Sequence, residues 1–213
     1  MNRLLRSESR RVALRLIILL GLFVGISPPS PAQTVIVIYK QELQLEVWKD
    51  GSKKRQWTIC KLSTLAGRKT KEGDMLVPEG IYEVDSYNPK SGSYKTLHIN
   101  YPNDFDLSQG CTGGAIGIHG KCSSVGCIGM RNEQMDEIVA LLKTELNNLP
   151  ISVLIFYSSK PNRTQNLIRI HRVRDSGSKT VFLERMEKVR EYWEEHHRMP
   201  NYGWDEHGYV LKH

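Results

Sequence analysis

Residues 115–132 read AIGIHGKCSSVGCIGMRN, and the rest of the chain is organised around this stretch. A short apolar run ends at His119, a turn rich in glycine and serine follows, and Cys127 comes eight positions after the histidine. The apolar run predicts a strand, and Asn132 resembles the start of a helix. We therefore expect a thiol and an imidazole to lie close together at a strand-to-helix turn.

The pairing of a cysteine with a histidine is typical of a thiol nucleophile. A free thiol has a pKa near ~8.5, and a neighbouring imidazole raises its reactive fraction by accepting the proton or by forming an ion pair. A third group must orient the imidazole. Gly120, Gly126 and Gly129 allow the backbone to fold tightly around the sulfur. Gly126 also allows neighbouring amides to point together as an oxyanion hole.

The same residues are compatible with two other kinds of site. Cys122 and Cys127 could form a disulfide, or they could bind zinc together with His119. A closed zinc site takes four ligands, and the stretch supplies only three, so the metal is the least favoured. The spacing alone does not decide between nucleophile, disulfide and metal.

Before this stretch, the chain has the pattern of a β-meander followed by further strands. β-Branched density, apolar alternation and an Asp50-Gly51 turn indicate short strands at the start. Segments rich in glycine, proline and charge, such as residues 67–79 and 101–114, are predicted to be loops. The predicted strands cover residues 34–40, 42–48, 56–62, 80–84, 94–100 and 115–118.

After the stretch, the apolar spacing becomes helical from Met135 to Leu146, and Pro150 stops the pattern. Residues 151–157, ISVLIFY, are apolar enough for a buried strand. We expect one principal helix to pack on a mainly β core, which is an α+β fold.

The C-terminal part is predicted to be an extension that carries a helix. Residues 158–180 are polar and basic, and Ile168, Ile170 and Val173 alternate there as one further strand. Residues 181–197 have the spacing of an amphipathic helix, which Pro200 ends.

Residues 1–32 have the pattern of an export signal. A start rich in arginine precedes an apolar run at residues 16–26, and Ser30-Pro31-Ala32 suits cleavage before Gln33. Eleven helical residues reach only about half of the hydrocarbon thickness of a bilayer. We expect a periplasmic protein with no stable membrane insertion after cleavage; an uncleaved anchor is the alternative.

The net charge of +7 does not indicate a nucleic-acid partner. The first 32 residues hold five arginines and one glutamate, which leaves +3 for the rest of the chain. The four cysteines, Cys60, Cys111, Cys122 and Cys127, all follow the leader. In an oxidising compartment they predict two disulfides, or at most one disulfide if one of them is a working thiol.

The motif at residues 119–130, HGKCSSVGCIGM, resembles the signature of the L,D-transpeptidase catalytic domain (YkuD-type) family, in which His-Gly is followed by Ser/Thr-x-Gly-Cys. The resemblance covers about residues 34–200, and within the family the chain is similar to the YafK-like members. It implies a YkuD-like β-sandwich or barrel core. Other segments that carry it are Gly67 with Glu72-Gly73-Asp74, residues 78–82, residues 97–103, residues 192–194 and Met199-Pro200.

Carried over to this chain, the resemblance implies that Cys127 is the nucleophile and His119 the base. Gly126 with Cys127 would supply oxyanion amides, and Ser124 and Gly120 would help to orient the turn. The implied substrate is a peptidoglycan stem peptide that carries diaminopimelate, attacked at an L-to-D linkage to give a thioester. No cofactor is implied.

Two positions depart from the common family pattern. Val125 stands where many members have histidine, and Gly129 where they have arginine. Arg131 could bind the substrate carboxylate instead, and His98 is expected to line the cleft.

These departures leave the acceptor open between an amine, which gives a transpeptidase, and water, which gives a hydrolase acting at the diaminopimelate centre. A wall-binding module with Cys127 bonded to Cys122 is a third, non-enzymatic alternative. If a structural disulfide exists, we expect it between Cys111 and Cys122. We predict a leader at 1–32, a catalytic domain at 33–158 and an extension at 159–213; the sequence does not indicate an oligomeric state.

Overall fold

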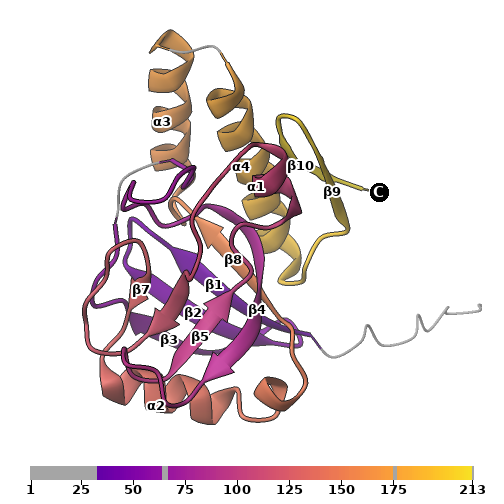
Figure 1. The fold of residues 1–213 in the computed structure, drawn as a ribbon. Helices are drawn as coiled ribbons and strands as arrows, with labels where there is room; N and C mark the ends of the chain where they lie inside the picture. Colours follow the sequence, from indigo (N-terminus) through magenta and orange to yellow (C-terminus); the bar gives the residue numbers. More distant parts are fainter. Residues whose placement is uncertain (1–32, 64–66, 175–176, 213) are drawn as a thin grey trace, which may run out of the picture. The chain divides into compact units, whose positions relative to one another are not determined.

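An eight-stranded mixed sheet forms the centre of the computed structural model, which describes residues 33–63, 67–174 and 177–212 (Figure 1). The strand order is β3-β2-β1-β8-β4-β5-β6-β7. The predicted export signal lies outside the described residues. The strands are β1 (Thr34–Tyr39), β2 (Gln44–Lys49), β3 (Ser52–Thr58), β4 (Gly80–Asn88), β5 (Thr96–Ile99), β6 (Gly117–His119), β7 (Ile128–Gly129) and β8 (Ile151–Phe156).

The predicted β-meander is confirmed, because β1 pairs antiparallel with β2 and β2 with β3. β8 pairs parallel with β1 and antiparallel with β4, so it joins the meander to the later strands. The predicted α+β class is also confirmed, with a sheet that mixes both orientations.

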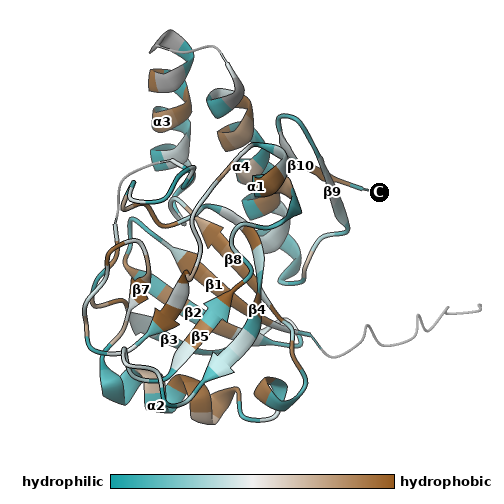
Figure 2. Cartoon of the chain, in the orientation of Figure 1, coloured by the Kyte–Doolittle hydropathy of each residue, from teal (hydrophilic) through white to brown (hydrophobic). Residues whose placement is uncertain are grey.

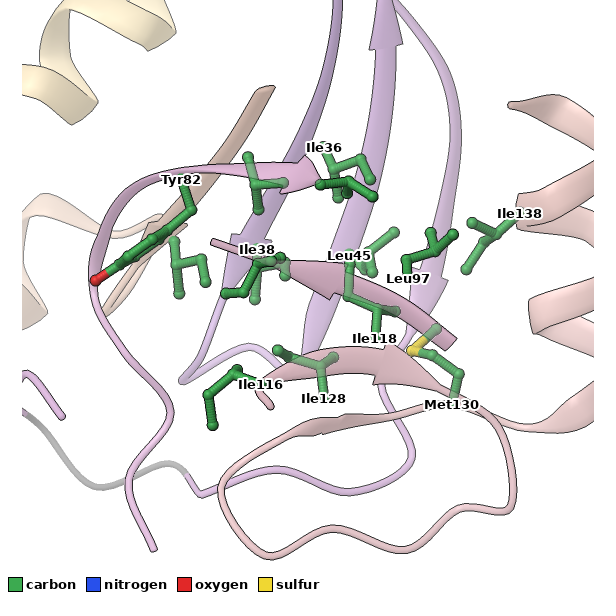
Figure 3. Packing of buried hydrophobic residues seen from close by; sticks show 14 of the residues in the cluster. Ile36, Ile38, Leu45, Tyr82, Leu97, Ile116, Ile118, Ile128, Met130 and Ile138 are labelled. Carbon is green, nitrogen blue, oxygen red and sulfur yellow. The ribbon is translucent and has the colours of Figure 1, made fainter. Parts of the chain in front are cut away.

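Helix α2 (Asn132–Leu141) begins at the predicted residue and covers one face of the sheet. Met135 and Ile138 from the helix are buried with Ile36 and Ile38 from β1 in one cluster. Figure 3 shows Ile138 approaching the side chains that β1, β5 and β6 send to this face. Each fully buried aliphatic side chain contributes about 1.5–3 kcal/mol, so this cluster anchors α2 to the sheet.

Helix α4 (Ser178–His196) covers the other face of the sheet. Val35 and Val37 alternate with Ile36 along β1 and pack against Val189 and Trp193 of α4. β1 is therefore apolar on both faces, as the brown strand in Figure 2 shows, because a helix lies on each side. The predicted amphipathic helix at residues 181–197 is confirmed, with a start three residues earlier.

The further strand predicted at residues 168–173 is wrong, because this segment belongs to helix α3 (Pro161–Arg174). Strand alternation would put Ile168 and Ile170 on one face, yet Ile168 is buried and Ile170 is exposed. Pro161 suits the first turn of a helix, since its missing N–H is not needed there.

Further short elements lie in segments that the sequence patterns did not resolve. The predicted loop at residues 101–114 contains helix α1 (Asp104–Ser108), which Asn103 caps by accepting from the Asp106 amide at 2.9 Å. Beyond Pro200, a hairpin of β9 (Tyr202–Asp205) and β10 (Gly208–Leu211) packs beside α4 (Figure 1). A single 3-10 turn covers Glu145–Asn147.

Among the helices of the described residues, none is both long and apolar enough to cross a bilayer.

A buried ion pair joins β1 to the loop at residues 67–79. The Lys40 ammonium lies 2.9 Å from the Glu79 carboxylate, and both side chains are almost fully excluded from solvent. Lys40 also donates to the carbonyls of Gly67 and Val77, and the Gly67 amide donates to Glu79. Both ends of the loop are therefore fixed to one point in the core.

Replacing Lys40 with methionine should lower the free energy of unfolding by about 3–5 kcal/mol, because it leaves the Glu79 charge buried without a partner. Urea unfolding followed by circular dichroism measures this loss. Adding Glu79→Leu to Lys40→Met should restore most of the stability. A double variant no more stable than the single one would contradict this account of the pair.

Candidate active site

The parallel pairing of β6 with β7 places the predicted nucleophile and base on one face of the sheet. Ile118 pairs with Ile128, and His119 with Gly129. The two isoleucines point into the core (Figure 3), so their neighbours in each strand point to the opposite face, and the partly buried Cys127 just before β7 also packs against this core cluster. Extended by one residue, the same register sets Cys127 beside Gly117, and the Gly117 amide does donate a hydrogen bond to the Cys127 sulfur.

This register makes His119 and Cys127 diagonal neighbours on adjacent strands. A strand spacing of about 4.8 Å and a two-residue rise of about 6.6 Å put their Cα atoms roughly 8 Å apart. His119 is only 7% exposed, and its Nδ1 lies 2.8 Å from the Gly120 carbonyl oxygen. A carbonyl accepts only from an N–H, so this contact puts the hydrogen on Nδ1 and leaves Nε2 able to accept a proton.

The thiol of Cys127 is partly buried and lies among backbone groups. It donates to the Ala115 carbonyl oxygen, 3.6 Å away, and accepts from the Gly117 amide. Burial raises the pKa of the Cys127 thiol, and this outweighs the lowering effects of the Gly117 amide and of the charge on Lys69. The resting sulfur is therefore protonated at neutral pH, and its reaction requires a base.

Three further predicted residues shape the turn. A Cβ on Gly120 would lie 2.6 Å from the Asn132 side-chain oxygen, so only glycine fits there. Gly126 has a φ of +92°, a conformation that other residues rarely adopt. The Ser124 hydroxyl donates to the Cys127 carbonyl, which holds the residue after Gly126 in place.

His98 lies on the same sheet face as the cysteine. It is half-buried and pairs with Gly117 in the β5–β6 register. Gly117 has no side chain, and a Cβ there would lie 2.7 Å from the Thr96 methyl group. Two strand spacings, about 10 Å, therefore separate His98 from Cys127, and the Thr96 methyl group covers Gly117.

Arg131 immediately precedes α2 and is exposed. Its amide donates to the Gln134 side chain at 2.9 Å, and its guanidinium forms no ion pair with the described residues. Met130 separates Arg131 from the end of β7, and no hydrogen bond or ion pair among the described residues joins the Arg131 side chain to Cys127.

The disulfide joins Cys60 to Cys122, so the predicted Cys111–Cys122 bridge is wrong. The Cα atoms of Cys60 and Cys122 are 5.3 Å apart. Cys111 is a buried free thiol, and Cys127 is also free. The alternative in which Cys122 bonds to Cys127 is therefore wrong as well. The physical reason is that the chain at residues 60–61 runs along β7, where the amides of Cys60 and Lys61 both donate to the Gly129 carbonyl at 2.9 Å.

A buried lysine near the thiol, Lys69, was not predicted from the sequence pattern. Lys69 is almost fully buried and lies 2.7 Å from Asp74, and its positive charge acts on Cys127. Burial raises the pKa of Asp74, but hydrogen bonds from Lys69 and three backbone amides bring it down to about 2. The only sequence signals of this lysine–aspartate pair are the glycines and the two charged residues, Lys69 and Asp74, within residues 67–79.

In the described part of the chain, no group of three or more metal-ligating side chains is close enough to hold an ion.

Residues 33–153 match the family model described as the L,D-transpeptidase catalytic domain. The chain belongs to this family of enzymes. It is 38% identical over 109 residues to YafK of Escherichia coli (strain K12), a protein assigned to the L,D-transpeptidases; the match covers 48% of this chain and 44% of that protein. The crystal structure of the helical cell shape determining protein Pgp2 from Campylobacter jejuni superposes with a TM-score of 0.52 and 27% identity, over 61% of this chain and 49% of that one. The chain thus matches less than half the length of these relatives.

One departure from the common L,D-transpeptidase pattern has a structural cause. A Cβ on Gly129 would lie 2.9 Å from the Ser123 carbonyl and 3.1 Å from the Lys61 carbonyl. The backbone at Lys61 therefore fills the space that a side chain at residue 129 would need. Val125, the other departure, is 79% exposed on the turn.

Thiol titration of the folded, unreduced protein should detect one reactive group, Cys127, because Cys111 is buried and the other two cysteines are bonded. The same protein in urea should show two. Cys127→Ala should lower each count by one. No reactive thiol in the folded protein, or two, would contradict the disulfide assignment or the burial of Cys111.

His119→Gln should slow alkylation of Cys127 by iodoacetamide at pH 7 by about tenfold or more, because the base that accepts the thiol proton is lost. Above the pKa of the thiol, the variant and the parent protein should react at similar rates, since the thiolate then forms without a base. His98→Gln, on the same face, is the matched control and should react like the parent protein. A uniform loss at every pH would argue against a base.

Proposed function

We propose that this chain is an exported, cysteine-dependent L,D-transpeptidase that acts on peptidoglycan stem peptides carrying diaminopimelate. The observation that supports it best is the position of a free Cys127 on one sheet face with His119, whose Nε2 is left as the proton acceptor by the contact with Gly120. Membership of the L,D-transpeptidase family supports the substrate class.

In the proposed acylation, Nε2 of His119 takes the thiol proton as the sulfur attacks the peptide carbonyl at the L-to-D linkage. The carbonyl π electrons move to oxygen, and the amides of Gly126 and Cys127 stabilise that oxyanion. The C–N bond then breaks, the imidazolium gives its proton to the leaving amine, and a thioester remains. The base is needed in this scheme because burial keeps the pKa of the resting thiol raised.

In the proposed second step, an acceptor amine attacks the thioester and gives up a proton, and the sulfur leaves as a thiol. The new amide bond is a cross-link. Water in place of the amine would give a free carboxylate, and this hydrolytic alternative is favoured by Gly129, where the common arginine is absent and no side chain fits. Cys127, His119, Gly126, Ser124 and Gly120 have the same roles in both reactions. Arg131 and His98 are proposed to contact substrate.

The periplasmic location is supported by the arginine-rich, apolar pattern of residues 1–32 and by the cell-wall substrate of the family. Pgp2 is described as a determinant of helical cell shape. A related role in wall remodelling and cell shape follows for this chain if it trims or cross-links the same polymer.

Incubation with purified wall fragments, followed by mass spectrometry of the products, tests the function. A cross-linked dimer supports transfer, whereas only trimmed or released peptides support hydrolysis. Cys127→Ala should abolish both products, and His119→Gln should lower the rate by about 10²–10⁴-fold. Cys111→Ser is the matched control, because it removes the other free thiol and should leave turnover intact. Products that persist in Cys127→Ala would refute the mechanism.

A further inference from the structure

A groove with a cavity volume of ≈ 280 Å³ lies between the β9–β10 hairpin and the segment that joins β5 to α1. None of the residues assigned to the proposed catalytic machinery lines it. One wall is aromatic and the other carries carboxylates and amides. The aromatic wall contains Tyr202, Trp204 and Tyr209, and the polar wall contains Glu83, Asn100 and Asp104.

The aromatic wall is built by strand alternation. Tyr202 and Trp204 are two residues apart in β9 and so share a face, and Tyr209 stands directly opposite Trp204 in the hairpin register. Phe105 of α1 supports the Trp204 ring at a centroid distance of 6.2 Å, and Tyr209 supports Tyr202 at 5.8 Å. Trp204 is nevertheless 45% exposed, whereas the other three tryptophans, Trp48, Trp57 and Trp193, are buried.

An exposed indole held in one orientation presents a flat apolar surface. The face of the ring carries partial negative charge and attracts polarised C–H groups. A rigid aromatic surface therefore suits a ligand with one apolar face of C–H groups.

The opposite wall suits hydroxyl and amide groups. Glu83 and Asp104 are exposed, and neither forms an ion pair with the described residues. The Asn100 oxygen accepts from the Glu83 amide at 2.9 Å, which fixes the orientation of that amide side chain. No lysine, arginine or histidine is among the described residues that line the groove. Because both charges are negative, the carboxylates of a stem peptide would be repelled here.

The groove is also close to the proposed nucleophile. Asn100 follows Ile99, whose amide donates to the Ile116 carbonyl at 3.0 Å, so Asn100 lies beside Ala115. Ala115 in turn accepts from the Cys127 sulfur. Two strand spacings, about 10 Å, therefore separate Asn100 from the sulfur, and Glu83 of β4 lies one strand farther away. About three extended residues cover the span from Asn100 to the sulfur.

We propose that this groove binds an N-acetylated sugar of the glycan strand that carries the stem peptide. The inference rests on the proposed function for the identity of the polymer. The ring of the sugar stacks on Trp204, and its hydroxyl and acetamido groups hydrogen-bond to Glu83, Asn100 and Asp104. The peptide attached to that sugar then extends towards Cys127.

Calorimetry of the purified chain with the tetramer of N-acetylglucosamine tests the site directly. The parent protein should bind, Trp204→Ala should bind at least tenfold more weakly, and Trp204→Phe should keep most of the affinity. Val210→Ala is the matched control, because Val210 is exposed on the same hairpin but on its opposite face. Addition of the tetramer should also protect the parent protein's exposed tryptophan from iodide quenching. Absence of tetramer binding, or binding unchanged in Trp204→Ala, would overturn the proposal.

Two competing ligands sharpen this test. Maltotetraose, which lacks the acetamido groups, should bind more weakly than the tetramer. Trilysine represents a cationic ligand for the two carboxylates, and it should not displace the tetramer. Displacement by trilysine that disappears in Glu83→Gln would make the groove a cation site and would overturn the sugar assignment.

A kinetic comparison separates this inference from the proposed function. With a stem peptide attached to its disaccharide, Trp204→Ala should raise KM about tenfold and leave kcat unchanged; with the free stem peptide neither constant should change. Turnover that depends on Cys127 but shows no such difference would overturn the groove alone. Sugar binding without any Cys127-dependent turnover would overturn the proposed function alone.

Discussion

The site depends on the parallel pairing of two very short strands, β6 and β7. This pairing fixes Ile118 beside Ile128 in the core, and by alternation it fixes His119 and Cys127 on the opposite face. A slip of one residue would turn the thiol into the core, so the register must be specified strongly. It is specified from both sides, because β5 pairs with β6, and the backbone at Lys61 pairs with Gly129 of β7.

The electrostatics of the thiol follow from this tight packing. The strands and the loop at residues 67–79 partly bury the sulfur, and this burial raises the pKa of Cys127. The loop also brings the charge of Lys69 near the thiol and is itself held by the buried Lys40–Glu79 pair. The Lys40–Glu79 pair therefore helps to position the loop that carries Lys69 and that partly buries the Cys127 thiol. Burial of the thiol and its contact with the Ala115 carbonyl both favour the neutral form of the resting sulfur.

The parts of the fold that the sequence predicted are those with strong local periodicity. The meander, α2 with its start at Asn132 and α4 repeat apolar residues at a clear period, and β8 is a dense apolar run before which Pro150 ends the helical pattern. The strand–turn–helix around Cys127 and His119 was predictable for the same reason. Helix α3 was not, because three spaced apolar residues in a polar segment match either period. The Cys60–Cys122 bridge joins residues 62 positions apart, so no local sequence pattern indicates it. The charge of Lys69 acts on the Cys127 thiol only because tertiary packing brings the two segments together, so it has no local pattern either.

The disulfide and the glycine at residue 129 form one structural feature. The Cys60–Cys122 bond holds residues 60–61 against β7, and the Cys122 amide donates to the carbonyl of Met130, the residue after β7. With the backbone so close, any side chain at residue 129 would overlap the carbonyls of Lys61 and Ser123. An arginine at this position therefore requires the segment at Lys61 to lie farther away, and the bridge prevents that. The absence of a side chain at residue 129 is thus compatible with how the bridge and the backbone at Lys61 brace the turn.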